Sequence, residues 1–373
     1  MERIDCGRVD GLIAEALARE LIDLGTAQRT RIVSRLLSGE RLSGEGLAQI
    51  LSVSRAAVHK HIEHLRDEGV AIRSAPGTGY ELVAPPDSLE PEFVLPSWLS
   101  RAPDNLRPAE PPLGLPALPY LYLARAESTN ELVRLAANRD APPGLLAVTD
   151  DQCAGRGRLG RVWVSEPGRD LTFSLLIRPD LGPAMLRHLL FAVAVAVAEV
   201  LDRLPGLGGR VGVKWPNDVL VDGEKVCGIL VETSLNMDTV YWMIIGVGIN
   251  VNSRPRAHMG DDWSVGGFPP VSVREATGST IVRPDLMVDV LERMTVRLEQ
   301  VLAGGTAEVL ARYRSLDSLL GRRVTVTSGA GVHARVIQGH ADGIGPDGGL
   351  FVRRDDGVRE QIDFGEAGLS VVP

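Results

Sequence analysis

The chain has 373 residues, 44% of them hydrophobic, and carries a formal net charge of -8 at pH 7. This length favours two or three domains with sizeable cores, and the negative charge excludes a protein that binds nucleic acid over its whole surface. The cysteines Cys6, Cys153 and Cys227 are isolated, which argues against a disulfide framework or a zinc site. The longest apolar run, Leu189–Ala198, is too short to span a bilayer, and no signal-peptide core follows the first residues. We therefore expect a cytoplasmic protein that does not bind a membrane.

The N-terminal part of the chain predicts a helical extension and a small helical unit. Helical spacing over Val9–Leu24 predicts one amphipathic helix in an extension of residues 1–28, to which we assign no function. Residues 29–84 predict three helices and a hairpin, which is the plan of a winged helix-turn-helix domain. Ser43 and Ser54 are suitable N-caps for the second and third helices.

The third of these helices is predicted over Arg55–Glu68, with Val58, Ile62 and Leu65 facing inward. Its basic face is suited to contact DNA in the major groove, and the alternative is a solvated helix in a protein-interaction domain. The caps, the turn and the hairpin together favour DNA. The candidate DNA-binding residues are Ser54, Arg55, Val58, His59 and Lys60.

The proline-rich stretch 85–119 predicts a linker, and residues 120–320 predict an α+β region with a largely hairpin-connected sheet. The expected strands are short and apolar: Tyr120–Ala124, Leu145–Thr149, Leu171–Ile177, Val211–Lys214, Val219–Val221, Val226–Thr233 and Val240–Val251. A capping box from Ser128 to Glu131 predicts a helix that ends at Asn138.

Further helices are expected over Pro183–Leu201, Pro284–Leu302 and Thr306–Leu320, with an irregular stretch over Ser253–Arg283. The tail, residues 321–373, predicts a small SH3-like β-barrel, because short strands alternate there with glycine turns. The strands of this tail are expected at Val324–Thr327, His333–His340, Leu350–Arg353, Glu360–Phe364 and Leu369–Val372.

The stretch Gly155-Arg-Gly-Arg-Leu-Gly-Arg161 lies between two predicted strands and combines three glycines with three arginines. Glycines let a backbone approach a ligand closely, and arginines supply forks of donors for phosphate or carboxylate. The stretch is therefore either a cradle for an anion or a solvated surface loop.

Lysine is scarce in this chain, which contains only Lys60, Lys214 and Lys225. Arginine does not replace a compact ammonium at a crowded site, so each remaining lysine is a functional candidate. Lys214-Trp-Pro-Asn-Asp218 and Lys225 fall on neighbouring predicted strands and can converge on one ligand. Ile245-Gly-Val-Gly-Ile-Asn250 places two glycines inside a strand, which leaves space for a flat group. No helix follows this GxG and no GxxxxGK[ST] occurs, which excludes a dinucleotide fingerprint and a P-loop.

Taken together, these motifs resemble the bifunctional biotin protein ligases that double as biotin operon repressors. The resemblance covers about residues 29–373 and rests on Ser128-Thr129-Asn130, Gln152, Gly155–Arg161, Trp163, Lys214–Asp218, Lys225, Gly228 and Gly246–Asn250. It implies a central mixed-sheet domain of the class II synthetase and biotin ligase type, between the helix-turn-helix and the SH3-like domain.

The family resemblance also implies a role for each matched residue. The implied biotin-binding residues are Ser128, Thr129, Asn130, Gln152, Gly155, Arg156, Lys225, Gly228, Gly246 and Gly248. The implied ATP or adenylate-binding residues are Arg158, Arg161, Trp163, Lys214, Asn217 and Asn250. The catalytic candidates are Lys225, Arg158, Lys214 and Asp218, of which Asp218 is proposed to orient or deprotonate an acceptor lysine.

The implied substrates are ATP, with Mg²⁺, and biotin, which form biotinyl-AMP before transfer to a lysine of a carboxylase biotin-carrier domain. The glycine–arginine loop is expected to cover this reactive adenylate. The implied further partners are operator DNA and a second copy of the chain when the adenylate is bound, and no metal site in the protein itself is expected. Three alternatives stay open: a lipoate-type ligase, a biotin-sensing transcription factor without enzymatic activity, and a ligase whose helix-turn-helix no longer represses.

Overall fold

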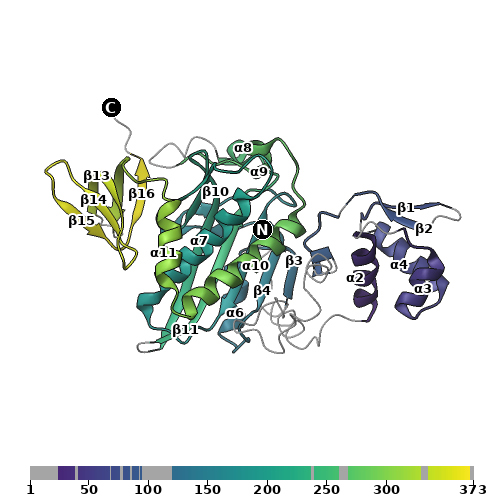
Figure 1. The fold of residues 1–373 in the computed structure, drawn as a ribbon. Coiled ribbons are helices and arrows are strands. Elements are labelled where there is room, and N and C mark those ends of the chain that lie inside the picture. Colours follow the sequence, from purple (N-terminus) through teal and green to yellow (C-terminus); the bar gives the residue numbers. More distant parts are fainter. Residues whose placement is uncertain are drawn as a thin grey trace.

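The computed structural model describes residues 24–37, 41–67, 69–75, 79–84, 86–91, 93–94, 120–236, 239–259, 268–328 and 335–369. The three units follow one another along the molecule, with the helical unit at one end and the C-terminal sheet at the other (Figure 1). The helix predicted over Val9–Leu24 lies outside the described residues except for Leu24.

The helical unit contains three helices, α2 (Leu24–Leu37), α3 (Gly44–Leu51) and α4 (Arg55–Asp67), followed by the antiparallel strands β1 (Ile72–Ala75) and β2 (Gly79–Leu82). Both predicted caps are confirmed, because Ser43 Oγ accepts from Gly46 N at 2.9 Å and Ser54 Oγ accepts from Ala57 N at 3.1 Å. The core of this unit is apolar and includes Ile32, Val33, Leu36, Leu47, Leu51, Val58, Ile62 and Leu65.

One predicted DNA-binding residue has a different position. Val58 is fully buried between the helices, whereas Arg55, His59 and Lys60 are exposed on the same helix. Assigning Val58 to a DNA contact is therefore wrong, because the helical period of 3.6 residues turns this position into the core together with Ile62 and Leu65.

The segment that follows the helical unit is not a free spacer over its first residues. Leu89 and Val94 are buried in the core of the central unit, while Phe93 is buried in the core of the helical unit. Arg283 fixes the same segment, since its backbone N and its Nε donate to Asp87 Oδ1 at 2.8 Å and 3.1 Å. The linker prediction is thus corrected for residues 86–91 and 93–94, and the rest of 85–119 lies outside the described part.

The central unit is built on a seven-stranded mixed sheet in the order β3-β4-β7-β11-β10-β9-β8. All neighbouring strands are antiparallel except β3 and β4, which are parallel. Their bounds confirm the seven predicted strands: β3 Tyr120–Ala126, β4 Leu146–Gln152, β7 Leu171–Ile177, β8 Val211–Lys214, β9 Asp218–Val221, β10 Glu224–Asn236 and β11 Thr239–Ile249.

Alternation along β11 separates the two faces of this sheet. Met243, Ile245 and Val247 join the larger core, beneath α7 (Leu186–Asp202) and α10 (Arg283–Leu302). Trp242 and Ile244 face the other side and join a smaller core with α6 (Thr129–Ala137). The two glycines Gly246 and Gly248 continue this second face, where the sheet is left open beyond α6.

The structure departs from the predictions in two helical regions of the central unit. Helix α11 covers Thr306–Ser315 instead of Thr306–Leu320, because the chain then leaves the helix and pairs with β8. Val213 N donates to Leu316 O at 2.8 Å, and Ser318 N donates to Val213 O at 2.9 Å. The stretch expected to be irregular contains two short helices, α8 (Pro255–Met259) and α9 (Val273–Thr277).

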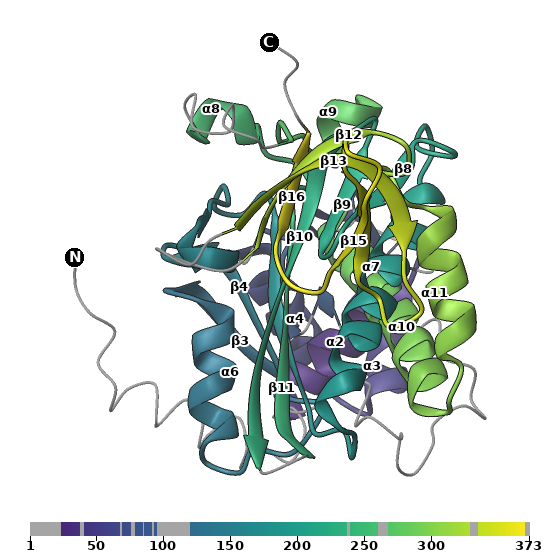
Figure 2. The same ribbon diagram turned by 90° about the vertical axis from the view of Figure 1, so that its left-hand side faces the viewer.

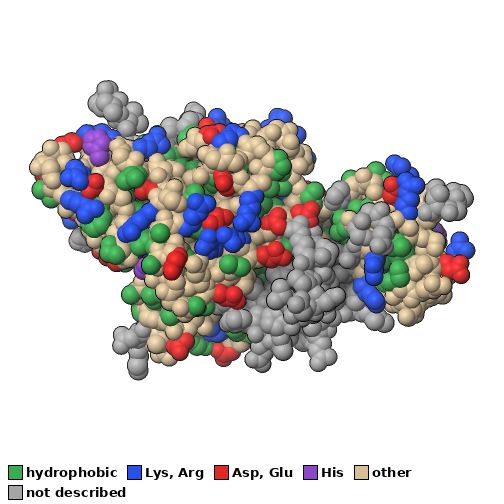
Figure 3. All heavy atoms as spheres, viewed as in Figure 1, with side chains coloured by type: hydrophobic (Ala, Val, Ile, Leu, Met, Phe, Trp, Pro, Cys, Tyr) green, Lys and Arg blue, Asp and Glu red, His purple; other side chains and the backbone are tan. Residues whose placement is uncertain are grey.

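Charged residues link the helices of this layer. Lys and Arg side chains gather over the long helices on the face shown in Figure 3. The buried Glu199 of α7 is surrounded by Arg293, Arg297 and Arg312 at 2.6 Å, 2.6 Å and 3.0 Å. Among the described residues, one stretch, Pro183–Asp202, has the length and apolarity of a membrane span, and most of it is buried in this core.

The C-terminal unit is a five-stranded antiparallel sheet in the order β15-β14-β13-β12-β16. Its strands are β12 Arg323–Ser328, β13 Arg335–Ile344, β14 Leu350–Arg353, β15 Arg359–Ile362 and β16 Glu366–Leu369. Strand β16 begins three residues before the predicted Leu369–Val372, where it pairs with β12. The sheet lies against the β8–β10 end of the central unit (Figure 2), and Trp215 Nε1 donates to Gly348 O at 3.0 Å across this contact.

Candidate functional site

The open part of the second sheet face forms the main pocket, a cavity of about 660 Å³. It lies between α6, the glycine–arginine loop, the β8–β11 strands and the C-terminal sheet. Every predicted ligand-binding or catalytic residue of residues 120–320 except Gly155 lines it: Ser128, Thr129, Asn130, Gln152, Arg156, Arg158, Arg161, Trp163, Lys214, Asn217, Asp218, Lys225, Gly228, Gly246, Gly248 and Asn250.

Gly155 lies behind the pocket wall and has a supporting position. The loop contains two short strands, β5 (Gly155–Arg156) and β6 (Val162–Trp163), and Gly155 is paired with Trp163. A Cβ at Gly155 would lie 2.4 Å from Trp163 O and 2.7 Å from Gln152 Nε2. Only glycine therefore lets the loop fold this tightly over the pocket.

The floor of the pocket is flat because three strand positions, Gly228, Gly246 and Gly248, lack side chains. A Cβ at Gly248 would lie 2.4 Å from Trp163 Cε2, and one at Gly228 would lie 2.9 Å from Trp163 Cζ3. The indole of Trp163 therefore lies against Gly228 and Gly248. Its Nε1 is buried and has no hydrogen-bond partner in the described part of the chain, so it has a donor to offer a ligand.

One end of the pocket is polar and uncharged at its floor. Ser174 Oγ donates to Asn130 Oδ1 at 2.6 Å, because an amide oxygen only accepts, and its oxygen lies within hydrogen-bond distance of Thr129 Oγ1 at 2.7 Å. Asn130 Nδ2 donates to Glu232 Oε2 at 2.8 Å. These side chains are fixed by each other, which suits recognition of a neutral polar ring by hydrogen bonds.

The predicted capping box at this end is wrong, although helix α6 begins where expected. Ser128 is the N-cap residue, but its side chain makes no capping hydrogen bond. Gln152 Oε1 accepts from Thr129 N at 2.9 Å instead, and Glu131 is paired with Arg134 and Arg156. Because Gln152 satisfies the helix start, the buried Ser128 hydroxyl is available to the pocket.

The other end of the pocket is cationic. Asp218 lies between two ammonium groups, 2.9 Å from Lys214 Nζ and 2.8 Å from Lys225 Nζ. Burial alone would raise the pKa of Asp218, but Lys214 and Lys225 outweigh burial and hold this pKa well below its usual range. The two ammonium groups favour the ionised carboxylate, and in this arrangement Asp218 orients both lysines toward the pocket.

Two arginines of the loop extend the cationic end. Arg158 Nη1 donates to Asn217 Oδ1 at 3.2 Å, and Asn217 Nδ2 donates to Ile229 O at 2.7 Å. Arg161 forms an ion pair with Glu366, which also lies 4.0 Å from Lys214 Nζ. The loop and the two lysine-bearing strands therefore converge on one place, as expected of an anion cradle.

Sequence reasoning missed Glu366 and the strap formed by residues Phe268–Val271. The strap runs beside Lys225, whose N donates to Pro269 O at 2.7 Å and whose O accepts from Val271 N at 3.0 Å. It brings the Phe268 ring to 5.1 Å from Lys214 Nζ. No motif marks either element, and the only signal for the strap is its apolar and proline character within a polar insertion.

Comparisons with known proteins agree with this geometry. Residues 122–250 match the model of the biotin/lipoate A/B protein ligase family. Residues 28–81 match an HTH domain, and residues 319–369 match the biotin protein ligase C-terminal domain. The matched ranges coincide with the helical unit, the pocket-bearing sheet and the C-terminal sheet.

Individual relatives resemble most of the chain. It is 30% identical over 329 residues to the bifunctional ligase/repressor BirA of Bacillus subtilis, covering 86% of this chain and 92% of that protein. It is 31% identical over 327 residues to the BirA of Escherichia coli, covering 87% and 92%. The solved biotin protein ligase of Aquifex aeolicus in complex with biotin and ATP has a TM-score of 0.55 and 29% identity, covering 67% of this chain and 98% of that one.

Replacing Asp218 by asparagine should destabilise the protein, because it removes the close counter-charge of the buried Lys214 ammonium and of the partly exposed Lys225 ammonium. We expect the free energy of unfolding at neutral pH to fall by about 3 kcal/mol in urea unfolding. The folded pKa of Asp218 lies below its unfolded value, so its stabilisation is present above about pH 4 and is lost as pH falls toward the folded pKa. The difference in the free energy of unfolding between wild type and variant should therefore become smaller in acid. A difference that does not change with pH would contradict this account.

Proposed function

The chain belongs to the family of bifunctional biotin protein ligases and repressors, and from this premise we propose that it biotinylates a lysine of a carboxylase biotin-carrier domain. ATP is the activating substrate. The observation that carries the proposal is the pocket itself, in which a neutral polar end and a flat glycine floor lead to a cluster of cations. The ring of biotin is neutral and its carboxylate is anionic, so the two ends of the pocket suit the two ends of biotin.

We assign the residues accordingly. Ser128, Thr129, Asn130 and Gln152 bind the ureido ring, and Gly246 and Gly248 give it room. The valerate chain runs past Gly228 and Arg156 toward Lys225, with Gly155 shaping the loop. Phosphates are bound by the cations of the other end, and Asn217, Trp163 and Asn250 adjoin the nucleotide. The residues assigned to the phosphates are Arg158, Arg161 and Lys214.

The first step joins two anions. A carboxylate oxygen of biotin attacks the α-phosphorus of ATP, a P–O bond forms, and the bond to pyrophosphate breaks. No base is required, because the carboxylate is already ionised, so the protein acts by holding the anions together. Lys214, Lys225 and Arg158 offset their repulsion, and removal of one such donor costs about 3 kcal/mol in comparable oxyanion sites.

The second step transfers the biotinyl group. An amine of the acceptor lysine attacks the acyl carbon, the new amide bond forms, and AMP leaves with the electron pair of the broken C–O bond. The adenylate hydrolyses in water, so the loop of residues Gly155–Arg161 must cover it until the acceptor arrives. Asp218 orients the lysines and the acceptor amine, and the amine loses its proton to solvent or to the departing AMP.

Magnesium is expected to arrive as the complex with ATP. The described residues contain no group of three or more His, Cys, Asp or Glu that could hold a metal ion. In this proposal the ion is held mainly by the substrate phosphates and water.

We further propose that the adenylate-bound protein dimerises and represses biotin biosynthesis genes from the cytoplasm. In this proposal the β1–β2 hairpin is the wing of a winged helix-turn-helix, and the C-terminal sheet closes as an SH3-like barrel. The support is the exposed basic face of α4 and the repressor names of the relatives. A ligase without repression remains the alternative, and a lipoate-type ligase is not favoured.

The decisive experiment incubates the protein with ATP, Mg²⁺ and a carboxylase biotin domain, in the presence of either biotin or lipoate. We expect mass spectrometry to show addition of one biotinyl group to one acceptor lysine and no lipoyl addition. An acceptor domain whose lysine is replaced by arginine is the control. Lipoyl transfer, or no transfer at all, would overturn the assignment.

Replacing Arg158 by glycine should let the adenylate escape, because the substitution removes a cation and its bond to Asn217 from the covering loop. We expect labelling of bystander lysines to rise about 10-fold, the effect of losing roughly one charged hydrogen bond. The exposed Arg169, which is outside the pocket lining, supplies the control Arg169→Gly. Bystander labelling at the wild-type level, with the adenylate still formed, would rule out this function of Arg158.

DNA binding is tested by Lys60→Ala and Val58→Ala. Footprinting on DNA upstream of biotin biosynthesis genes should show protection that requires biotin and ATP. Lys60→Ala should lower the slope of log affinity against log salt by about 1, as loss of one phosphate contact does. Val58→Ala should keep the slope and lower the free energy of unfolding by about 2 kcal/mol, because its side chain lies in the core. Equal slopes for wild type and Lys60→Ala would remove this lysine from the interface.

A further inference from the structure

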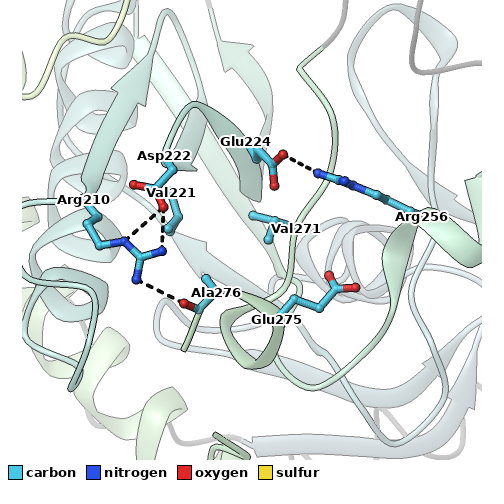
Figure 4. A pocket seen from close by; sticks show the side chains of 8 residues that line it. All are labelled: Arg210, Val221, Asp222, Glu224, Arg256, Val271, Glu275 and Ala276. Atoms are coloured by element: carbon cyan, nitrogen blue, oxygen red, sulfur yellow. Dashed lines mark hydrogen bonds and ion pairs between the residues drawn. The ribbon is translucent and has the colours of Figure 1, made fainter. Parts of the chain in front are cut away.

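The outer side of the strap Phe268–Val271 faces a second cleft, an open hollow of about 330 Å³ (Figure 4). Two arginine–carboxylate pairs line it. Arg210 is paired with Asp222 at 2.5 Å, and Arg256 forms an ion pair with Glu224. Both arginines are paired with carboxylates, and the third carboxylate of the lining, Glu275, closes the capping box of α9 with Ser272. The Arg256–Glu224 pair, however, connects the strap to a strand of the main pocket.

Arg256 connects three elements with one guanidinium. It comes from α8, its Nη2 is paired with Glu224 at the start of β10, and its Nε donates to Pro270 O of the strap at 3.0 Å. Glu224 immediately precedes Lys225. The Arg256–Glu224 pair therefore ties the outer side of the strap to the strand that carries a lysine of the main pocket.

The inner side of the strap walls that pocket. Phe268 and Pro270 line it, and Phe268 is 6% exposed. The inner side is held by the two backbone hydrogen bonds to Lys225, by one from Asn250 Nδ2 to Val271 O at 3.1 Å, and by the Phe268 ring, which packs in the core 5.1 Å from Lys214 Nζ. On the outer side, Arg256 adds a hydrogen bond from a charged group to Pro270 O.

We propose that the Arg256–Glu224 pair is a clasp that positions the strap and thereby sets the affinity of the cationic end for the nucleotide. The proposal rests on the proposed function, in which ATP occupies this end. If the strap is already ordered, ATP does not have to order it on binding, and the entropic cost of binding is smaller. Arg256 and Glu224 do not line the main pocket, so they are positioning residues that act through Phe268 and Lys225.

The Arg210–Asp222 pair of the same cleft is a matched control. Arg210 is held by Asp222 and by Ala276 O at 3.1 Å, and neither of these groups belongs to the strap. Its side chain is 36% exposed and that of Arg256 is 48% exposed, so both tolerate substitution to a similar degree. Loss of either pair removes one comparable ion pair from the surface. Only loss of the Arg256–Glu224 pair is expected to release the strap.

The test measures adenylate formation by biotin-dependent exchange of pyrophosphate into ATP. We expect Arg256→Gln and Glu224→Gln each to raise KM for ATP by about 5- to 10-fold, with KM for biotin changed less than about 2-fold. The double variant should resemble either single variant, because the two residues form one interaction. Arg256→Lys, which keeps the charge, should recover part of the affinity.

Arg210→Gln should leave both KM values at the wild-type level. A similar loss in Arg210→Gln, or a parallel rise of KM for ATP and biotin, would overturn the clasp. Direct binding of a fluorescent ATP analogue to the same variants separates this outcome from a failure of the proposed function. Weaker analogue binding in Arg256→Gln but not in Arg210→Gln supports the clasp even if no biotin is transferred, and equal binding in the two variants contradicts it.

Discussion

The architecture of the pocket depends on one buried carboxylate between two ammonium groups. Lys214 and Asp218 are each 4% exposed. Burial of an ion without a partner lowers the free energy of unfolding by several kcal/mol. Asp218 holds Lys214 and Lys225 at 2.9 Å and 2.8 Å and so permits two like charges to share one end of a sheet. An ammonium has three donors, and each lysine keeps some of them for a second anion. Stability of the sheet and the capacity to bind a further anion therefore come from the same three side chains.

Local chemistry made much of the molecule predictable from the sequence. The strands of the central sheet are apolar runs between turn residues, and the seven-stranded order brings their motifs to one face. Gly246 and Gly248 predict a place where another group approaches the strand closely, because glycine otherwise destabilises the interior of a β-branched strand. The scarcity of lysine singled out Lys214 and Lys225 before any geometry was known. Such signals are local, since each depends on neighbours within one strand or one turn.

What the sequence could not provide depends on contacts between distant segments. Glu366 reaches Arg161 across 205 residues, and nothing around it marks it as part of the pocket. Gln152 replaces Ser128 as the partner of the helix start only because β4 ends beside α6. The assignment of Val58 to DNA was wrong for a local reason, because the helical spacing that places Ile62 and Leu65 in the core places Val58 there too. Long-range packing decides only the first two cases.

The short segment with Leu89, Phe93 and Val94 has a thermodynamic consequence. Its side chains belong to two cores at once, so neither the helical unit nor the central unit can melt without exposing apolar surface of the other. The two units then behave as one cooperative block, and free energy gained when a ligand fills the pocket also protects the helices from unfolding. The helical unit is therefore most resistant to unfolding when the ligands of the central unit are abundant in the cell.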